Sequence, residues 1–274
     1  MLLPLFLLPL LFFALPTSAQ FFNDTFASDE ALPRNVTGEG IPLGVPGVGM
    51  GDPALDSPIV LANGLSMQYG TISPSVQFQA SGILLQGCTM IVNINPCFQM
   101  MLAASGQLQP GADSPRQRIE FLSTPFGQEG EQWRYRWRYR LSPGVASGPN
   151  FFHMFQLLSR DLGGYVIALD LISGSVVIRE SVPSRCGAAC PSIPQSAFLG
   201  ITTSHDLSVT YGDGGSISYT VRNAATNALI LQYNVSNSFI PAMASAKMGI
   251  YRAVVSTTSA AQAFAGAFNF QRLA

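Results

Sequence analysis

The stretch from Trp133 to Arg140 constrains the fold of this chain more than any other, because aromatic and cationic residues alternate along it without a break. It reads Trp-Arg-Tyr-Arg-Trp-Arg-Tyr-Arg. Successive side chains of a β-strand point to opposite faces, so this strand has four aromatic rings on one face and four guanidinium groups on the other. One of these faces must pack in a core, and the other must meet water.

Segments of strand length, separated by turn residues, fill most of the chain after residue 75. Hairpins are expected around residues 172–174 and 212–215. A Met- and Ala-rich stretch at 98–104 fits one or two helical turns as well as a strand. The expected strands cover residues 75–85, 88–94, 116–122, 133–140, 151–158, 165–170, 175–180, 207–211, 216–222, 228–233, 246–255 and 263–271. This pattern predicts an all-β chain folded as a β-sandwich or jelly roll.

The first residues have the features of a secretion signal. Residues 2–15 are almost entirely Leu, Phe and Pro, and Thr17-Ser18-Ala19 supplies small residues for cleavage before Gln20. The apolar run is too short and too often interrupted by proline for a good membrane span. We therefore expect a signal peptide at 1–19, a mobile arm rich in Pro and Gly at 20–62 and one β-domain at 63–274.

The cysteines and the glycosylation motifs fit an extracellular protein. Three acceptor sequences of the type Asn-x-Ser/Thr occur, at Asn23, Asn35 and Asn234. An even set of cysteines suits an oxidising compartment. Close spacing favours Cys88 with Cys97 and Cys186 with Cys190 among the three connectivities. A metal site is the weaker alternative, because no histidine lies near either pair.

Charge limits the partners of this chain. Its net charge is −1, which indicates neither nucleic acid nor an anionic membrane as a partner. No organic cofactor is indicated, and no cluster of acids resembles a calcium loop, although a structural calcium bound partly by backbone carbonyl groups would leave no sequence signal. We expect a monomer.

Residues 247–252, Lys-Met-Gly-Ile-Tyr-Arg, form a second informative strand. Lys247, Gly249 and Tyr251 share its polar face, and apolar residues occupy the other. Glycine inside a strand often marks the close approach of a ligand or another backbone, so a sugar ring could lie over Gly249. The alternative is a simple bulge with an aromatic residue at the edge of the core.

Several short segments, taken in order, resemble those of fungal glucuronan lyases, polysaccharide lyase family 20. The matching segments are 117–120 with the family's Gln-Arg-x-Glu, 131–141 with Tyr-Arg-Tyr-x-Trp, 152–157 with His-Ile-x-Gln-Leu, 210–219 with Tyr-Gly-x-x-Gly-Ser, and 247–252 with Lys-Trp-Gly-Ile-Tyr-Arg. The resemblance covers the chain from about residue 65 to its end. It implies a concanavalin-like jelly roll of two antiparallel sheets with a concave groove, a fold shared with alginate lyases.

The chain departs from the family pattern at positions close to these motifs. Met248 replaces the family's Trp, Ala246 its Pro, and Leu158 its Lys. The Trp and Lys positions both bear on contact with a sugar. The identity of the substrate is therefore less defined than the fold.

The resemblance implies β-elimination on a uronic-acid polysaccharide. This reaction removes the proton at C5 and breaks the bond at C4, and it needs donors that neutralise the carboxylate beside C5. Arg118 and Gln156 match the positions of such donors. Tyr251 is the main acid/base candidate, and His153 is the second. The expected substrate-binding residues are Lys247, Gly249, Glu120 and Arg116.

His153 poses a geometric problem. It lies three residues before Gln156, so the two side chains point to opposite faces of a regular strand. Either a bulge intervenes or only one of them faces the groove. A histidine between Phe152 and Phe155 is also often a hydrogen-bonded core residue. The other histidine, His205, is expected in a turn.

Two other classes of function compete with a lyase. A glycoside hydrolase needs two carboxylates across a cleft, but Glu120 is the only acid in a promising strand, which disfavours hydrolysis. A non-catalytic, lectin-like or cell-wall-associated jelly-roll protein stays open, because fold does not fix function. The arginines at 134, 136, 138 and 140 fit a polyuronate-binding surface or a solvated outer face equally well.

Overall fold

The computed structural model describes residues 68–274, apart from 89–91, 110–111, 113, 182–185 and 187–189. The expected signal peptide and Pro/Gly-rich arm lie outside the described residues, as do the acceptors Asn23 and Asn35. Within the described ranges, no helix has the length and apolar character needed to cross a membrane.

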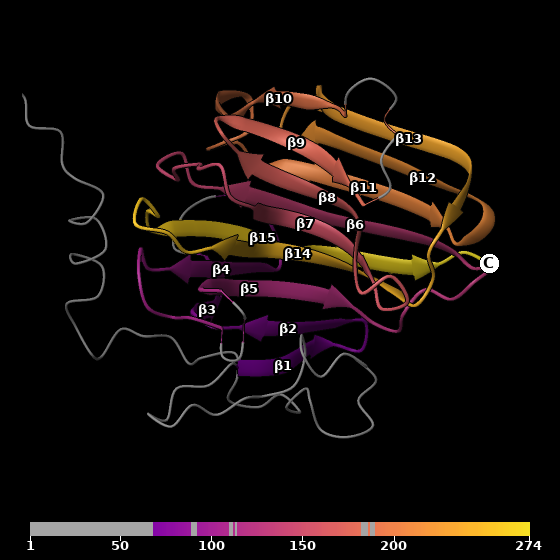
Figure 1. The fold of residues 1–274 in the computed structure, drawn as a ribbon, viewed down its shortest axis with the longest axis horizontal. Coiled ribbons are helices and arrows are strands. Elements are labelled where there is room, and N and C mark those ends of the chain that lie inside the picture. The colour runs from indigo at the N-terminus through magenta and orange to yellow at the C-terminus, as the bar shows by residue number, and fades with distance from the viewer. Residues whose placement is uncertain (1–67, 89–91, 110–111, 113, 182–185, 187–189) are drawn as a thin grey trace, which may run out of the picture. The chain divides into compact units, whose positions relative to one another are not determined.

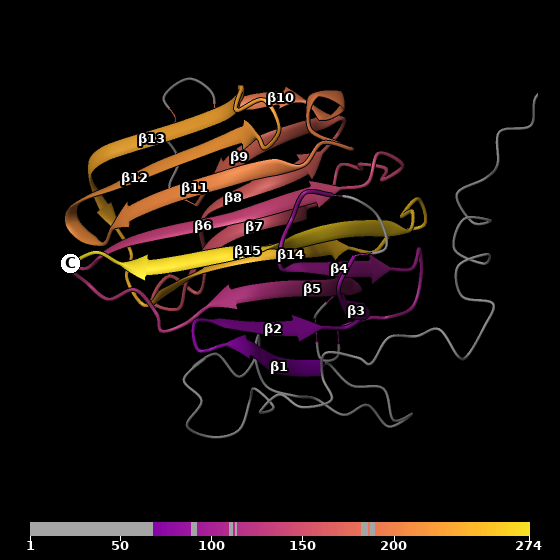
Figure 2. The same ribbon diagram turned by 180° about the vertical axis from the view of Figure 1, so that it is seen from behind.

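Two antiparallel sheets form the structure (Figures 1 and 2), as the jelly-roll prediction requires. The first sheet has eight strands in the spatial order β1 (Gln68–Ser73), β2 (Val76–Ala80), β5 (Arg116–Ser123), β14 (Ala244–Ala253), β7 (Phe152–Ser159), β8 (Gly164–Ile172), β9 (Ser175–Glu180) and β10 (Ser192–Pro194). The second has seven, in the order β13 (Leu229–Ile240), β12 (Gly212–Asn223), β11 (Thr203–Thr210), β6 (Gln132–Leu141), β15 (Ala261–Arg272), β4 (Cys97–Leu102) and β3 (Ile83–Gln86). Within the described residues, a 3₁₀ turn, η2 (Gln195–Ala197), is the only helical element.

The core lies between the sheets, and the aromatic face of β6 packs in it. Its aromatic residues are buried while the arginines between them are half-buried, which confirms the predicted alternation. Trp137 of β6 packs against Phe155 of β7, with ring centroids 5.1 Å apart, and so joins the two sheets. The faces turned away from this core carry the polar side chains of both sheets.

Three strand predictions need correction. The single strand expected at 75–85 is two strands, β2 and β3, which belong to different sheets. Residues 98–104 are not helical, because they belong mostly to β4, whose six residues are all buried. Periodicity alone does not distinguish such a continuous buried strand from a buried helix. The expected strand at 88–94 is absent from its described part, where Asn93 has a φ of +55°, a value that an extended strand does not accommodate.

The expected cross-links and hairpin turn are confirmed. Disulfides join Cys88 to Cys97 and Cys186 to Cys190. The β8–β9 hairpin turns through Ser173 and Gly174, with φ values of +47° and +82°. Positive φ at both central residues is the requirement of a type I′ turn, whose twist matches that of the flanking strands.

His205 is a core residue of β11 and not the turn residue that the sequence suggested. Its two ring nitrogens lie 2.7 Å from the hydroxyl oxygens of Thr203 and Tyr219, and its ring stacks on Trp137 with centroids 4.6 Å apart. The start of β11 is difficult to predict from the polar sequence Thr-Ser-His-Asp. The inward-facing positions of this segment hold Thr203 and His205, which are polar and not apolar.

Burial of His205 makes the stability of the fold depend on pH. It lowers the pKa of His205 from 6.5 to about 3. Between these values the unfolded chain binds a proton that the folded chain does not. The free energy of unfolding should therefore decrease as the pH falls from 6.5 toward 3, by up to about 1.4 kcal/mol per pH unit.

Urea denaturation at neutral and at mildly acidic pH measures this effect. The wild-type protein is expected to lose stability in acid, and His205→Gln is expected to lose less, because glutamine cannot take up the proton. An equal loss in both proteins would assign the acid sensitivity to other groups.

Candidate active site

Three adjacent strands of the first sheet carry all the catalytic and substrate-binding residues expected from the sequence (Figure 1). β14 runs between β5 and β7, and its Tyr251 is paired with Arg118 on one side and His153 on the other. Met248 and Ile250 of β14 pack in the core. Lys247 and Tyr251, which alternate with them in sequence, therefore lie on the face of the sheet turned away from the core.

A β-bulge places His153 and Gln156 on the same face of β7. The register of β7 against β8 shifts between His153 and Phe155. Met154 and Phe155 consequently both pack in the core. His153 and Gln156 both bond to polar side chains of the first sheet. Of the two alternatives that the sequence left open, the structure contains the bulge.

Tyr251 lies between two guanidinium groups. Arg116 Nη1 donates a hydrogen bond of 3.0 Å to the phenol oxygen. Arg118 lies against the phenol ring, with its Cζ 3.8 Å from the ring centroid. The ring of His153 is 5.6 Å from that of Tyr251. Negative charge that develops on the Tyr251 oxygen thus meets a fixed donor and a second nearby cation.

Glu120 connects Arg118 and Gln156, the two residues expected to neutralise a substrate carboxylate. Gln156 Nε2 donates to Glu120 Oε1 over 2.7 Å, and Arg118 Nε forms an ion pair with Oε2 at 3.2 Å. Arg118 Nη1 also donates to Gln79 Oε1 over 2.8 Å. Arg118 and Glu120 are each 1% exposed, and a buried pair of this kind is tolerated only with such hydrogen bonds. Glu120 therefore holds Arg118 and Gln156 together, and these two side chains already bind a carboxylate.

Asp170 of β8 contacts the candidate site but was not among the residues predicted from the sequence. Its fully buried carboxylate is hydrogen-bonded to His153 Nδ1, and its other oxygen lies 3.3 Å from Arg179 Nη1. A carboxylate at Nδ1 holds the proton on that nitrogen and makes Nε2 the basic one. One sequence signal could have identified it: Asp170 is a single acid within the apolar run of β8. An acid buried in such a run is expected to have a charged or hydrogen-bonding partner.

The neighbouring strand β5 leaves no room for a side chain at Gly249. A Cβ atom added at this position would lie 2.1 Å from the backbone oxygen of Ile119 in β5, and the φ of Gly249 is +155°. Its carbonyl oxygen also accepts a 2.9 Å hydrogen bond from Tyr139 Oη. The close approach of another backbone accounts for the glycine without a sugar above it. Lys247, two residues earlier, is 1% exposed and is paired with Gln156 in register.

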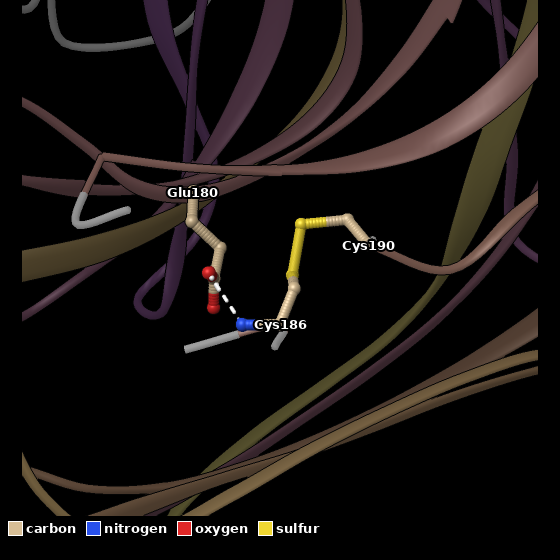
Figure 3. Close-up of side chains that lie close together, drawn as sticks. All are labelled: Glu180, Cys186 and Cys190. Atoms are coloured by element: carbon tan, nitrogen blue, oxygen red, sulfur yellow. Dashed lines mark hydrogen bonds between the residues drawn. A yellow bond between two sulfur atoms is a disulfide. The ribbon is translucent and has the colours of Figure 1, made fainter. Parts of the chain in front are cut away.

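Glu180, Cys186 and Cys190 form the one group of potential metal ligands within 4.8 Å of one another in the described part of the chain (Figure 3). The two sulfur atoms are joined in a disulfide, so they cannot bind a metal as thiolates. Glu180 instead accepts a 3.0 Å hydrogen bond from the backbone nitrogen of Cys186. This geometry joins Cys186 to the end of β9 and does not resemble a metal centre.

Solved structures match this chain, whereas no protein-family model and no curated protein sequence does. The endo-β-1,4-glucuronan lyase from the fungus Trichoderma reesei matches with a TM-score of 0.52 and 14% identity, over 74% of this chain and 93% of that chain. Alginate lyase AlgAT5 from polysaccharide lyase family 7 matches with a TM-score of 0.47 and 12% identity, over 67% and 82%. An alginate lyase from Corynebacterium sp. gives 0.46 and 16%, over 64% and 76%.

These identities are too low to transfer an activity, and the similarity concerns the fold. The resemblance to glucuronan lyases that the sequence motifs predicted is confirmed at that level. The chain has the jelly-roll architecture of the fungal glucuronan lyase, with two antiparallel sheets packed face to face.

Proposed function

We propose that this protein is a secreted polysaccharide lyase that cleaves a uronic-acid polymer of the glucuronan type by β-elimination. The observation that carries the proposal is the convergence of Tyr251, His153, Arg118 and Gln156 on one sheet face from three adjacent strands. The glucuronan-lyase fold supports the same class of reaction. The two disulfides, together with the exposed glycan acceptor Asn234 on β13, support secretion.

Tyr251 is the proposed acid and base. Its oxygen, as a phenolate stabilised by Arg116 and Arg118, takes the proton from C5 of the sugar ring. The electron pair of the C5–H bond then forms a C4=C5 double bond, and the bond from C4 to the glycosidic oxygen breaks. The phenol returns the proton to that departing oxygen. His153 is the alternative base for the C5 proton, and Asp170 holds its ring in place.

Arg118 and Gln156 are the proposed donors to the carboxylate at C5. Loss of the C5 proton moves negative charge onto this carboxylate, and fixed donors in a site with little water stabilise that charge most. Both donors already bind the carboxylate of Glu120. Because Arg118 is 1% and Gln156 4% exposed, a sugar reaches them only when the groups that cover them move aside.

The ultraviolet absorbance of the product tests this proposal. A C4=C5 double bond conjugated to a carboxylate absorbs short-wavelength ultraviolet light that the saturated sugar does not absorb, and hydrolysis creates no such group. Purified protein incubated separately with glucuronan, alginate and pectate is expected to raise the absorbance with at least one of them, and glucuronan is the first candidate. Folded protein that gives no signal with any polyuronate would contradict the proposal.

Binding without cleavage is the second candidate function. It is favoured by one observation, which is that Glu120 already occupies donors of both Arg118 and Gln156. Protein that binds a polyuronate in calorimetry but never forms the double bond would establish this function in place of the lyase.

A further inference from the structure

The outer face of the second sheet carries a cluster of arginines that the proposed reaction does not use. β6, β11 and β12 lie side by side there (Figure 2), and a depression of about 540 Å³ follows them. Four arginines line it, together with one acid and several Ser and Thr side chains. These charged residues are Arg134, Arg136, Arg138, Arg222 and Asp206. Hereafter they are called the arginine face.

Strand register explains how the arginines gather. Ser204 of β11 is paired with Arg138 of β6 on one side and Arg222 of β12 on the other. Along β6, alternate residues face the same way, so neighbouring arginines are about 6.6 Å apart at the backbone. The small Ser and Thr side chains between the long arginines leave the depression open.

The positive charge of this face is local and mostly uncompensated. The chain has 14 Lys and Arg residues and a net charge of −1, yet four of its arginines line one depression. Asp206 is the only acid there, and Arg134 binds it through two contacts of 2.8 and 2.5 Å. The other three arginines form no ion pair with an acid in the described parts of the chain.

Two of those three arginines donate hydrogen bonds to uncharged backbone oxygens, and the third has a buried Nε without a hydrogen-bond partner among the described residues. Arg138 donates to the backbone oxygen of Asn93 over 2.7 Å, and Arg222 donates to that of Asn227 over 3.0 Å. The Nε of Arg136 is buried and has no hydrogen-bond partner among the described residues. Neutral acceptors fix the guanidinium groups without cancelling their charge, so the face is prepared for an anion.

We propose that the arginine face is a second binding site, for the carboxylate groups of an acidic polysaccharide. Guanidinium groups bind carboxylates through paired hydrogen bonds, and the Ser and Thr hydroxyls suit the hydroxyls of a sugar. The choice of a polyuronate as occupant rests on the proposed function. Nucleic acid fits less well, because Trp137 and His205, the aromatic residues beneath the face, are buried and cannot stack on a base.

An adjoining depression indicates that the occupant is a long chain. It has a volume of about 650 Å³ and shares Arg138 and Ala267 with the depression at the arginine face. A polymer bound at the arginines can continue into it, whereas a short oligosaccharide cannot fill both. The face should therefore hold the polymer on the protein and add to its affinity by avidity.

Calorimetric titration with glucuronan or alginate polymer tests this site, in a Tyr251→Phe background that prevents cleavage. Arg136→Gln is expected to weaken polymer binding about tenfold, because it removes one charged hydrogen-bonding group. Arg140→Gln is the matched control, since Arg140 is the next arginine on the same face of β6 but lies outside the depression.

The triple change of Arg136, Arg138 and Arg222 to Gln should weaken binding further. All proteins are deglycosylated first, because the acceptor Asn234 is hydrogen-bonded to Ser218, which lines the depression.

The outcomes separate this site from the proposed reaction. Polymer affinity that the triple change leaves intact, in protein with a native circular dichroism spectrum, would overturn the proposal. Tighter binding of a DNA oligonucleotide than of polyuronate would overturn the choice of occupant. If wild-type protein cleaves no polyuronate but Arg136→Gln still weakens binding, the lyase proposal fails and the binding site stands.

Discussion

Replacement of Tyr251 by Phe is expected to lower kcat for polyuronate cleavage by about 10²–10⁴-fold, because it removes the group that transfers the proton. The ring remains, so its contacts with Arg118 and His153 should persist and KM should change little. Initial rates at saturating polymer, measured from the absorbance of the new double bond, provide the test.

Tyr165→Phe is the matched control for this experiment. Tyr165 also contacts the ring of His153, with centroids 5.5 Å apart, but its hydroxyl has no role in the proposed reaction. This variant should retain most of the wild-type kcat. If Tyr251→Phe kept the wild-type kcat, Tyr251 would not take part in proton transfer. An equal decrease of kcat in both variants would indicate a structural effect around His153.

Replacement of Gly249 by Ala is expected to destabilise the fold by about 3 kcal/mol or more. The added methyl group would lie 2.1 Å from the Ile119 backbone oxygen, and a backbone atom inside a sheet cannot move aside cheaply. Gly249 is paired with Glu120 of β5. Separation of β14 from β5 would therefore also move the Arg118–Glu120 pair away from Tyr251 of β14. Urea denaturation gives the change in the free energy of unfolding.

Gly163→Ala separates steric overlap from backbone strain. Gly163 has a φ of +66°, but a Cβ atom there meets no heavy atom within 4 Å. Its substitution should cost only about 1 kcal/mol, from the strained backbone. Equal costs at the two positions would show that the close approach of β5 does not explain Gly249.

Alternation in the sequence was sufficient to predict the main features of the fold. The aromatic and arginine faces of β6 are visible in the sequence, because each side chain's direction follows from its position in a strand. The turn at Ser173-Gly174 was equally visible, since few residue pairs adopt two successive positive φ values. β4 was ambiguous because a strand buried on both faces has no alternation to read.

Features that depend on the partner strand could not be predicted with the same certainty. The bulge that turns His153 and Gln156 to one face is a shift in register against β8, and the sequence of β7 alone permits either arrangement. The pairing of His153 with Asp170 likewise depends on which residue of β8 lies opposite. The contact of Arg116 with the Tyr251 hydroxyl results from the adjacency of β5 and β14, which sequence spacing does not reveal.

The mass spectrum of the products tests the central claim most directly. β-Elimination yields oligosaccharides whose new non-reducing end lacks one water relative to the saturated sugar. The wild-type protein is predicted to release such unsaturated oligosaccharides from glucuronan or another polyuronate, and Tyr251→Phe should release almost none. Saturated oligosaccharides alone, or no product from folded protein with any polyuronate, would contradict the assignment of an eliminating active site to β5, β14 and β7.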